Sequence, residues 1–255
     1  MEQGTKTPIR AVRRAAAVLR ALARRETAGV TELATELDLP KSTVHNYLVT
    51  LLEEEFVVRD GDDYRLGLGC LDLGGAVRDG TRLFEIAREP VDDLAQEVNE
   101  LGVLAVAEHG YSVYLYQTGG TKAVTLDSHL GTRRPMHCTA TGKSMLAHLP
   151  PERVETILER HGLDRRTENT ITDRGTLLDD LAAIRERGYG VDDEELIVGM
   201  RAVAAPIVPE PGGELLGTIA VTGPTSRMHG DRFRTEVPEL VTRFARLVEI
   251  NAEYS

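Results

Sequence analysis

Residues 31–52 read TELATELDLPKSTVHNYLVTLL. Apolar residues recur at helical spacing before and after the break at residues 38–40. A residue that precedes proline is steered away from helical geometry, and proline suits a helix start. The stretch therefore predicts a short helix over 31–37 with Thr31 as its cap, a tight turn, and a helix that begins near Lys41. In that second helix four apolar residues are expected to face a core: Val44, Leu48, Leu51 and Leu52.

The first turns of the second helix carry small polar side chains and one cation on the other face. A short helix, a tight turn and such a helix are typical of a helix-turn-helix, whose second helix contacts DNA from its N-terminal end. Serine, threonine and asparagine can each reach bases or phosphates. The outward residues are Lys41, Ser42, Thr43, His45 and Asn46.

The flanking segments fit this arrangement. Residues 7–25 predict a helix with arginines on one face and a buried stripe of Ile9, Val12, Ala16, Leu19 and Ala23 on the other. Residues 56–59 and 64–66 predict two strands around the turn signal at 60–63, which would form a wing. By itself the pattern also fits a small helical hairpin with a solvated polar face.

Charge is distributed unevenly along the chain. The 255 residues carry a net charge of -11, with 9 basic and 9 acidic residues up to position 60, which leaves 30-9=21 basic and 41-9=32 acidic residues after it. A neutral N-terminal module and an acidic C-terminal one make nucleic acid a candidate partner of the former. The 30 basic residues include only four lysines, which fits either adaptation to high salt or a GC-rich genome.

Several classes of protein are excluded by simple counts. Apolar runs such as residues 103–107 are far shorter than the roughly 20 residues that cross a bilayer, and the arginine-rich start is no secretory signal. A cytoplasmic location and no membrane partner are expected. Cys70 and Cys138 stand in no zinc-binding spacing and the histidines are scattered, so reduced thiols, no metal and no cofactor are predicted.

The remainder predicts an antiparallel α+β domain after a linker helix. Helices are expected at 83–101, 139–147, 151–160, 173–187 and 231–252. Strands are expected at 103–108, 112–117, 123–126, 189–191, 201–208 and 215–221. The helices are expected to pack at one face of the sheet.

Several runs together resemble the IclR family of transcriptional regulators. Residues 31–34, 39–45 and 64–67 are similar to its winged helix-turn-helix, and residues 134–137, 139–143, 188–195 and 199–206 are similar to its effector-binding domain. The resemblance covers nearly the whole chain. It implies a winged helix-turn-helix domain at 1–67, a linker helix at 68–80 and a GAF-like α+β domain at 81–255.

The resemblance also implies two sets of functional residues. DNA contacts would come from Lys41, Ser42, Thr43, His45, Asn46, Arg14, Arg59 and Arg65. A small-molecule effector would contact Ala140, Thr141, Asp192, Met200, Ala202, Ala220 and Thr222. The chain departs from the family pattern at three of these positions. Asn46 stands where relatives often carry arginine, Ala202 replaces a cysteine, and Ala220 replaces a serine. The wing tip is acidic, so DNA contact is assigned to Arg59 or Arg65 beside it.

The predicted function is a transcriptional repressor or activator controlled by an organic acid of a catabolic pathway. It would bind a palindromic operator as a homodimer or dimer of dimers, since two recognition helices must lie about 34 Å apart. The alternatives are a small-molecule hydrolase with an accessory helical domain and an architectural DNA binder that senses nothing.

Catalytic and nucleotide-binding motifs are not supported. His137 and Cys138 are adjacent, and neighbouring residues of a strand point to opposite faces. The Gly142-Lys143-Ser144 run lacks the first glycine of a phosphate-binding loop. The four acids at 192–195 are expected to cap a turn or face water, and only Asp192 is assigned a role in effector binding.

Overall fold

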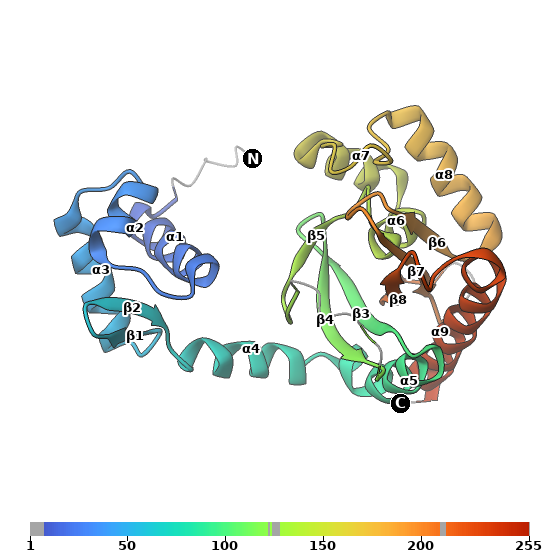
Figure 1. Cartoon of the computed structure of the whole chain (residues 1–255), viewed down its shortest axis with the longest axis horizontal. Helices are drawn as coiled ribbons and strands as arrows, with labels where there is room; N and C mark the ends of the chain where they lie inside the picture. Colours follow the sequence, from blue (N-terminus) through green and yellow to red (C-terminus); the bar gives the residue numbers. More distant parts are fainter. Residues whose placement is uncertain (1–7, 122, 124–127, 210–212, 255) are drawn as a thin grey trace, which may run out of the picture. The chain divides into compact units, whose positions relative to one another are not determined.

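The computed structural model describes residues 8–121, 123, 128–209 and 213–254. The chain forms two compact units, Met1–Arg78 and Asp79–Ser255, which are described separately (Figure 1).

The first unit is a winged helix-turn-helix. Helices α1 (Arg10–Arg25), α2 (Val30–Glu36) and α3 (Lys41–Glu53) precede an antiparallel pair of strands, β1 (Val57–Asp60) and β2 (Asp63–Leu66). The backbone of Ala28, between α1 and α2, exchanges hydrogen bonds of 3.0 and 2.9 Å with Tyr64 of β2. This bridge joins the wing to the helices, and the predicted order of elements is confirmed.

The predicted buried stripe of α1 is wrong except at Leu19, which is half-buried against the core. Val18, Ala21 and Leu22 form the buried face, whereas Ile9 is 71% and Val12 is 64% exposed. Apolar residues occupy most positions from 15 to 22, so periodicity alone did not single out one face of this helix. Among the predicted partners on α3, Val44, Leu48 and Leu51 are buried.

Two smaller predictions in this unit are also wrong. Leu52 of α3 is 40% exposed, because it lies beside the buried face rather than on it. Helix α2 begins at Val30, with Gly29 and not Thr31 at the cap position. The Glu32 carboxylate accepts a 3.0 Å hydrogen bond from the Gly29 amide and thereby satisfies one free amide at the helix start.

Helix α4 (Gly69–Asp79) follows the wing, where a linker helix is predicted. The structure describes all of α4, and none of its side chains is buried. Its apolar residues and the preceding Leu68 are exposed, with Leu71 at 68% and Val77 at 70%.

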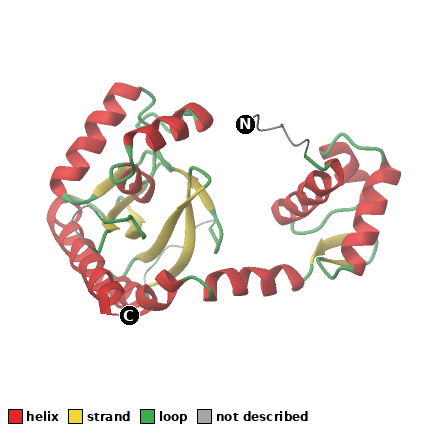
Figure 2. Cartoon of the chain, turned by 180° about the vertical axis from the view of Figure 1, so that it is seen from behind, coloured by secondary structure: helices red, strands yellow, loops and turns green. Residues whose placement is uncertain are grey.

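The second unit is built on a six-stranded antiparallel sheet with the strand order β5-β4-β3-β8-β7-β6. Figure 2 shows the strands in yellow and the helices around them in red. The strands are β3 (Leu101–Glu108), β4 (Tyr111–Gly119), β5 (Arg133–Pro135), β6 (Gly190–Asp193), β7 (Met200–Ile207) and β8 (Gly217–Pro224). The helices are α5 (Arg82–Val98), α6 (Ala140–Leu146), α7 (Pro151–His161), α8 (Arg174–Arg187), the π-helical turn η1 (Arg232–Glu236) and α9 (Val237–Tyr254).

Helices cover both faces of this sheet, so the prediction of helices at one face is wrong. Val203 and Ala205 of β7 pack in one core with α5 and α9, whereas Ala202 and Ala204 pack in a second core with α6, α7 and α8. Neighbouring strand residues point to opposite faces. A strand that is apolar at every position, as β7 is from 202 to 205, is therefore buried on both sides.

The remaining differences concern segment ends. The helix predicted at 83–101 ends at Val98, because Asn99 adopts a left-handed conformation with φ 60°. The strand predicted at 123–126 lies outside the described residues except for Ala123, and β5 instead pairs with β4 through Ser112 and Arg134. Among the described residues, no helix combines the length and apolarity needed to cross a bilayer.

Candidate functional site

The start of α3 presents a polar surface. Lys41, Ser42, His45 and Asn46 are exposed and Thr43 is half-buried. The apolar side chains Val44, Leu48 and Leu51 hold the opposite side of α3 in the core of the first unit. The fold therefore leaves the predicted DNA-contacting side chains of α3 available to a ligand.

The three predicted arginines lie on other elements of the first unit. Arg14 is half-buried on α1, and Arg65 is exposed on β2. Arg59 of β1 donates a 2.9 Å hydrogen bond to the Gly61 carbonyl and lies 3.6 Å from an Asp62 carboxylate oxygen. The acidic wing tip thus offsets part of the Arg59 charge.

The second unit contains a cavity where the effector is predicted to bind. Its empty volume is about 470 Å³, part of it open to solvent. Six of the seven predicted residues line it: Ala140, Thr141, Asp192, Met200, Ala202 and Thr222. The seventh, Ala220, does not. It is buried in β8 between Val103 and Ala204 of the neighbouring strands.

The cavity also has walls that the sequence interpretation missed. They are Val103, Tyr114, Arg134, Thr139, Leu196, Ile197 and Arg201. Val103 and Tyr114 lie on β3 and β4, which pair with each other, and alternation along those strands is the signal that could have indicated one shared face. Nothing local in the sequence indicates that this face opens onto the cavity.

Asp192 shapes one wall of the cavity rather than only facing it. Its side chain accepts hydrogen bonds from the backbone amides of Glu195 at 2.7 Å and Leu196 at 3.3 Å. These bonds fold residues 192–196 into a turn that places Leu196 and Ile197 in the cavity lining. Burial raises the pKa of Asp192 to about 7, against the effect of the two amides.

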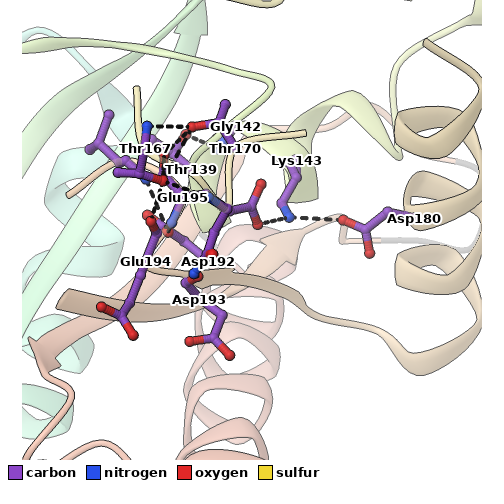
Figure 3. A network of polar contacts seen from close by, with 12 residues as sticks. Thr139, Gly142, Lys143, Thr167, Thr170, Asp180, Asp192, Asp193, Glu194 and Glu195 are labelled. Carbon is purple, nitrogen blue, oxygen red and sulfur yellow. Dashed lines mark hydrogen bonds and ion pairs between the residues drawn. The ribbon is translucent and has the colours of Figure 1, made fainter. Parts of the chain in front are cut away.

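Behind this wall lies a buried charged network (Figure 3). Lys143 of α6 is 2% exposed and pairs with the Glu195 carboxylate and, at 2.9 Å, with Asp180 of α8. Thr170 donates a 2.7 Å hydrogen bond to the Glu195 carbonyl. The acids at 192–195 cap a turn as expected, but Asp192 and Glu195 are buried rather than solvated.

Helix α6 forms the opposite wall. The Thr139 hydroxyl accepts a 3.1 Å hydrogen bond from the Gly142 amide and donates one of 2.9 Å to the Pro135 carbonyl. A side chain at Gly142 would collide with the Met136 backbone, so a glycine is required for this close approach. The same contacts fix Ala140 and Thr141 at the cavity.

The two arginines of the cavity wall have different surroundings. Arg201 donates hydrogen bonds to Asp193 at 2.6 Å and to the Met228 carbonyl at 2.8 Å, which hold it at the rim. Arg134 lies against the Tyr114 hydroxyl. Burial raises the pKa of Tyr114, and the charge and hydrogen bond of Arg134 oppose that rise.

The His137-Cys138 pair lacks the properties of a nucleophile and base. These residues lie in a turn and not in a strand, so the predicted reason for their separation is wrong. His137 forms a 3.0 Å hydrogen bond with the Asp164 carbonyl, and burial raises the pKa of Cys138 to about 12. Within the described ranges, no group of three or more metal-binding side chains comes together.

Comparisons with known proteins agree with this architecture. Residues 11–61 match the profile described as the IclR helix-turn-helix domain, and residues 76–250 match that of the bacterial transcriptional regulator IclR C-terminal domain. The chain is 36% identical, over 90% of its length and 89% of the relative's, to a Halobacterium salinarum protein named "Probable HTH-type transcriptional regulator ArcR".

Solved structures share the fold. An IclR transcriptional regulator from Alicyclobacillus acidocaldarius superposes with a TM-score of 0.81 at 26% identity, covering 96% of this chain and 100% of the other. An IclR homologue from Microbacterium hydrocarbonoxydans, solved with 4-hydroxybenzoate, gives a TM-score of 0.81 at 24% identity with the same coverage. The chain described here therefore belongs to the IclR family of DNA-binding transcriptional regulators.

Proposed function

We propose that this protein binds a palindromic operator in the cytoplasm and changes its DNA affinity when an organic acid occupies the cavity of the second unit. The cavity carries this proposal, because it brings together the start of α6, the Asp192 turn and β7 in one small space. We assign DNA binding to residues 1–67, the linker to 68–80 and effector binding to 81–255.

The operator contacts are assigned to the exposed start of α3. Lys41, Ser42, His45 and Asn46 supply a cation and hydrogen-bonding groups at the helix end that enters the major groove in this class of fold. Thr43, Arg14 and Arg65 would add contacts from the flanks. We assign Arg59 a weaker role, since Gly61 and Asp62 already engage its guanidinium.

The effector is assigned to the class of small organic acids. Hydroxyl groups of Thr141 and Thr222 and the carboxyl of Asp192 stand among apolar side chains such as Met200 and Ala202. An apolar pocket with few polar groups suits a small molecule with a hydrocarbon body, and the Arg134 guanidinium in the lining would pair with the carboxylate of an acid. The 4-hydroxybenzoate bound by the Microbacterium relative is of this class and serves as the first probe.

Self-association is assigned to the exposed apolar residues of α1 and α4. Five apolar side chains are more than 60% exposed: Ile9 just before α1, Val12 on α1, Leu68 just before α4, and Leu71 and Val77 on α4. Apolar side chains that gather on one exposed element indicate a protein–protein interface when they form a continuous patch. A homodimer, or a dimer of dimers, would pair two copies of α3 on a palindrome.

An enzymatic role is not proposed. The hydrolase alternative requires an activated nucleophile, and burial keeps the Cys138 thiol protonated at neutral pH. A purely architectural DNA binder would have no use for the cavity of the second unit.

The test is fluorescence anisotropy of the purified protein on DNA from its own upstream region, with 4-hydroxybenzoate, acetate and the neutral amide of each. We expect saturable, sequence-dependent binding that one acid alters and its amide does not. Ala202→Leu fills the cavity and should abolish the acid response while DNA binding persists. Ala182→Leu, on the exposed face of α8, is the matched control. Binding that no acid changes would contradict effector control, and the absence of specific binding would contradict the α3 assignment.

A further inference from the structure

Four arginines surround a surface groove on the second unit, away from the cavity. The groove lies where α8 ends beside the first turns of α9. Its lining comprises Arg187, Tyr189, Arg234, Thr235, Pro238, Glu239, Thr242, Arg243 and Arg246. None of these residues lines the effector cavity, so the two sites are separate.

The charge of the groove is opposite to that of the chain around it. After position 60 the chain has 41-9=32 acidic and 30-9=21 basic residues, yet the groove lining has four guanidinium groups and a single carboxylate, Glu239. Carboxylates outside the lining compensate two of these guanidinium groups, because Asp180 pairs with Arg187 and Glu97 pairs with Arg243. The like charges of the other two arginines repel each other unless an anion lies between them. The groove is therefore a candidate anion site.

Two of the four guanidinium groups are held in fixed positions. Arg187 donates a 2.7 Å hydrogen bond to the Tyr189 carbonyl, lies 3.4 Å from an Asp180 carboxylate oxygen and lies 5.2 Å above the Tyr189 ring. Arg243 pairs with Glu97 of α5 at 2.5 Å and lies 4.9 Å above the Phe244 ring. Groups that are already ordered lose less conformational entropy when a ligand binds.

The other two guanidinium groups are those of Arg234 and Arg246. Both side chains are exposed, and neither forms a hydrogen bond or ion pair with any residue in the described part of the chain. A guanidinium presents donors in a planar fork that matches the oxygens of phosphate or carboxylate. Two uncompensated guanidinium groups in the same groove lining suit a ligand with more than one negative group.

We propose that this groove binds a small polyanion with two or more closely spaced negative groups, either phosphate-bearing or polycarboxylate. The empty space of about 890 Å³ suits a small molecule. The Glu239 carboxylate in the lining would repel the continuous phosphate row of a DNA duplex. The groove shares no lining residue with the effector cavity or with α3, so a failure of this proposal would leave effector control and operator binding untouched.

The test is isothermal titration calorimetry of the full chain with inorganic pyrophosphate and, in a second arm, with citrate, at constant ionic strength. We expect saturable binding of one anion per chain. Arg234→Gln/Arg246→Gln should weaken it at least about tenfold, because it removes two charge-assisted contacts. The relative affinities of pyrophosphate and citrate then decide which source of negative groups the site prefers.

The matched control is Arg153→Gln/Arg160→Gln, which removes two exposed arginines from α7 without touching the groove. Circular dichroism establishes that both variants fold. Equal weakening in both variants, or binding of neither anion, would overturn the proposal. Loss of operator affinity in the groove variant without any pyrophosphate or citrate binding would overturn it in favour of a DNA contact.

Discussion

The ammonium of Lys143 on α6 lies 2.9 Å from the Asp180 carboxylate on α8. Lys143 also pairs with Glu195, which lies in the turn that Asp192 forms at the cavity wall. Lys143 thus links α6 and the Asp192 turn, which form two walls of the cavity, to α8 on the side away from the cavity. The lysine is 2% exposed, so its charge and those of its partners have lost most of their hydration.

Replacing Lys143 alone should lower the stability of the folded protein. Lys143→Met leaves the buried Glu195 carboxylate without its partner, and we expect a loss of about 3–5 kcal/mol in the free energy of unfolding, measured with urea. Adding Glu195→Leu should restore part of it. Arg174→Met, which breaks the partly exposed pair with Glu155, is the control and should cost about 1 kcal/mol or less. Equal losses in the two single variants would contradict the buried network.

The Asp192 carboxyl should make stability depend on pH. Its pKa is about 7 in the folded protein and about 4 in an unfolded chain, so the native state binds more protons between these values. Its contribution to stability therefore falls as pH rises from about 4 to about 7. Asp192→Asn retains an oxygen for the turn but cannot titrate, so its profile of melting temperature against pH should be flatter in this window. Asp179→Asn on α8 should keep the slope of the unmodified protein, and equal slopes in all three proteins would refute this role for Asp192.

Lys41 should contribute to operator binding through charge. We expect Lys41→Gln to weaken affinity about tenfold and to reduce the salt dependence of binding by about one phosphate contact. Because Lys41 is exposed, circular dichroism should show an intact fold. Arg160→Gln on α7 makes the same change of charge in the second unit and should bind DNA normally. An unchanged affinity for Lys41→Gln would exclude this orientation of α3 on DNA.

The exposed apolar residues of α4 should hold two chains together. Leu71→Glu/Val77→Glu places charges on this surface, and sedimentation equilibrium should show dissociation toward monomers. The operator affinity should fall as the dimer dissociates, since a monomer contacts only one half-site. Val198→Glu, at a 73% exposed residue of the second unit, is the control. A dimer that survives the α4 change would place the interface elsewhere.

The scarcity of lysine and the net charge of -11 fit either adaptation to high salt or a GC-rich genome, and the salt dependence of operator binding distinguishes the two. If the host is halophilic, specific operator binding should survive in molar potassium chloride, where counterion release normally weakens protein–DNA complexes severely. The operator affinity should be measured by fluorescence anisotropy at potassium chloride concentrations from about 0.1 to about 2 M. Complete loss of specific binding below about 0.5 M would leave a GC-rich genome as the explanation of the arginine content.

Features that depend on near neighbours along the chain could be predicted from the amino-acid sequence. The spacing of Val44, Leu48 and Leu51 specifies the buried face of α3, and Pro40 ends the turn before it, because residues three and four apart share one side of a helix. The same locality explains the wing and most helices of the second unit. It fails on α1, where a nearly continuous apolar run leaves the choice between Val12 and Val18 to whichever side meets the rest of the core.

Contacts between residues that are distant along the chain depend on how the segments pack in three dimensions. The sheet order sets β3 beside β8, and helices then bury both faces because every position along β7 from 202 to 205 is apolar. Lys143 and Glu195 are 52 residues apart and look like ordinary surface residues in the sequence. They become a buried pair because packing α6 and the Asp192 turn against the sheet excludes water from both charges. A sequence pattern records the type of a side chain, whereas its solvation depends on which segments fold over it.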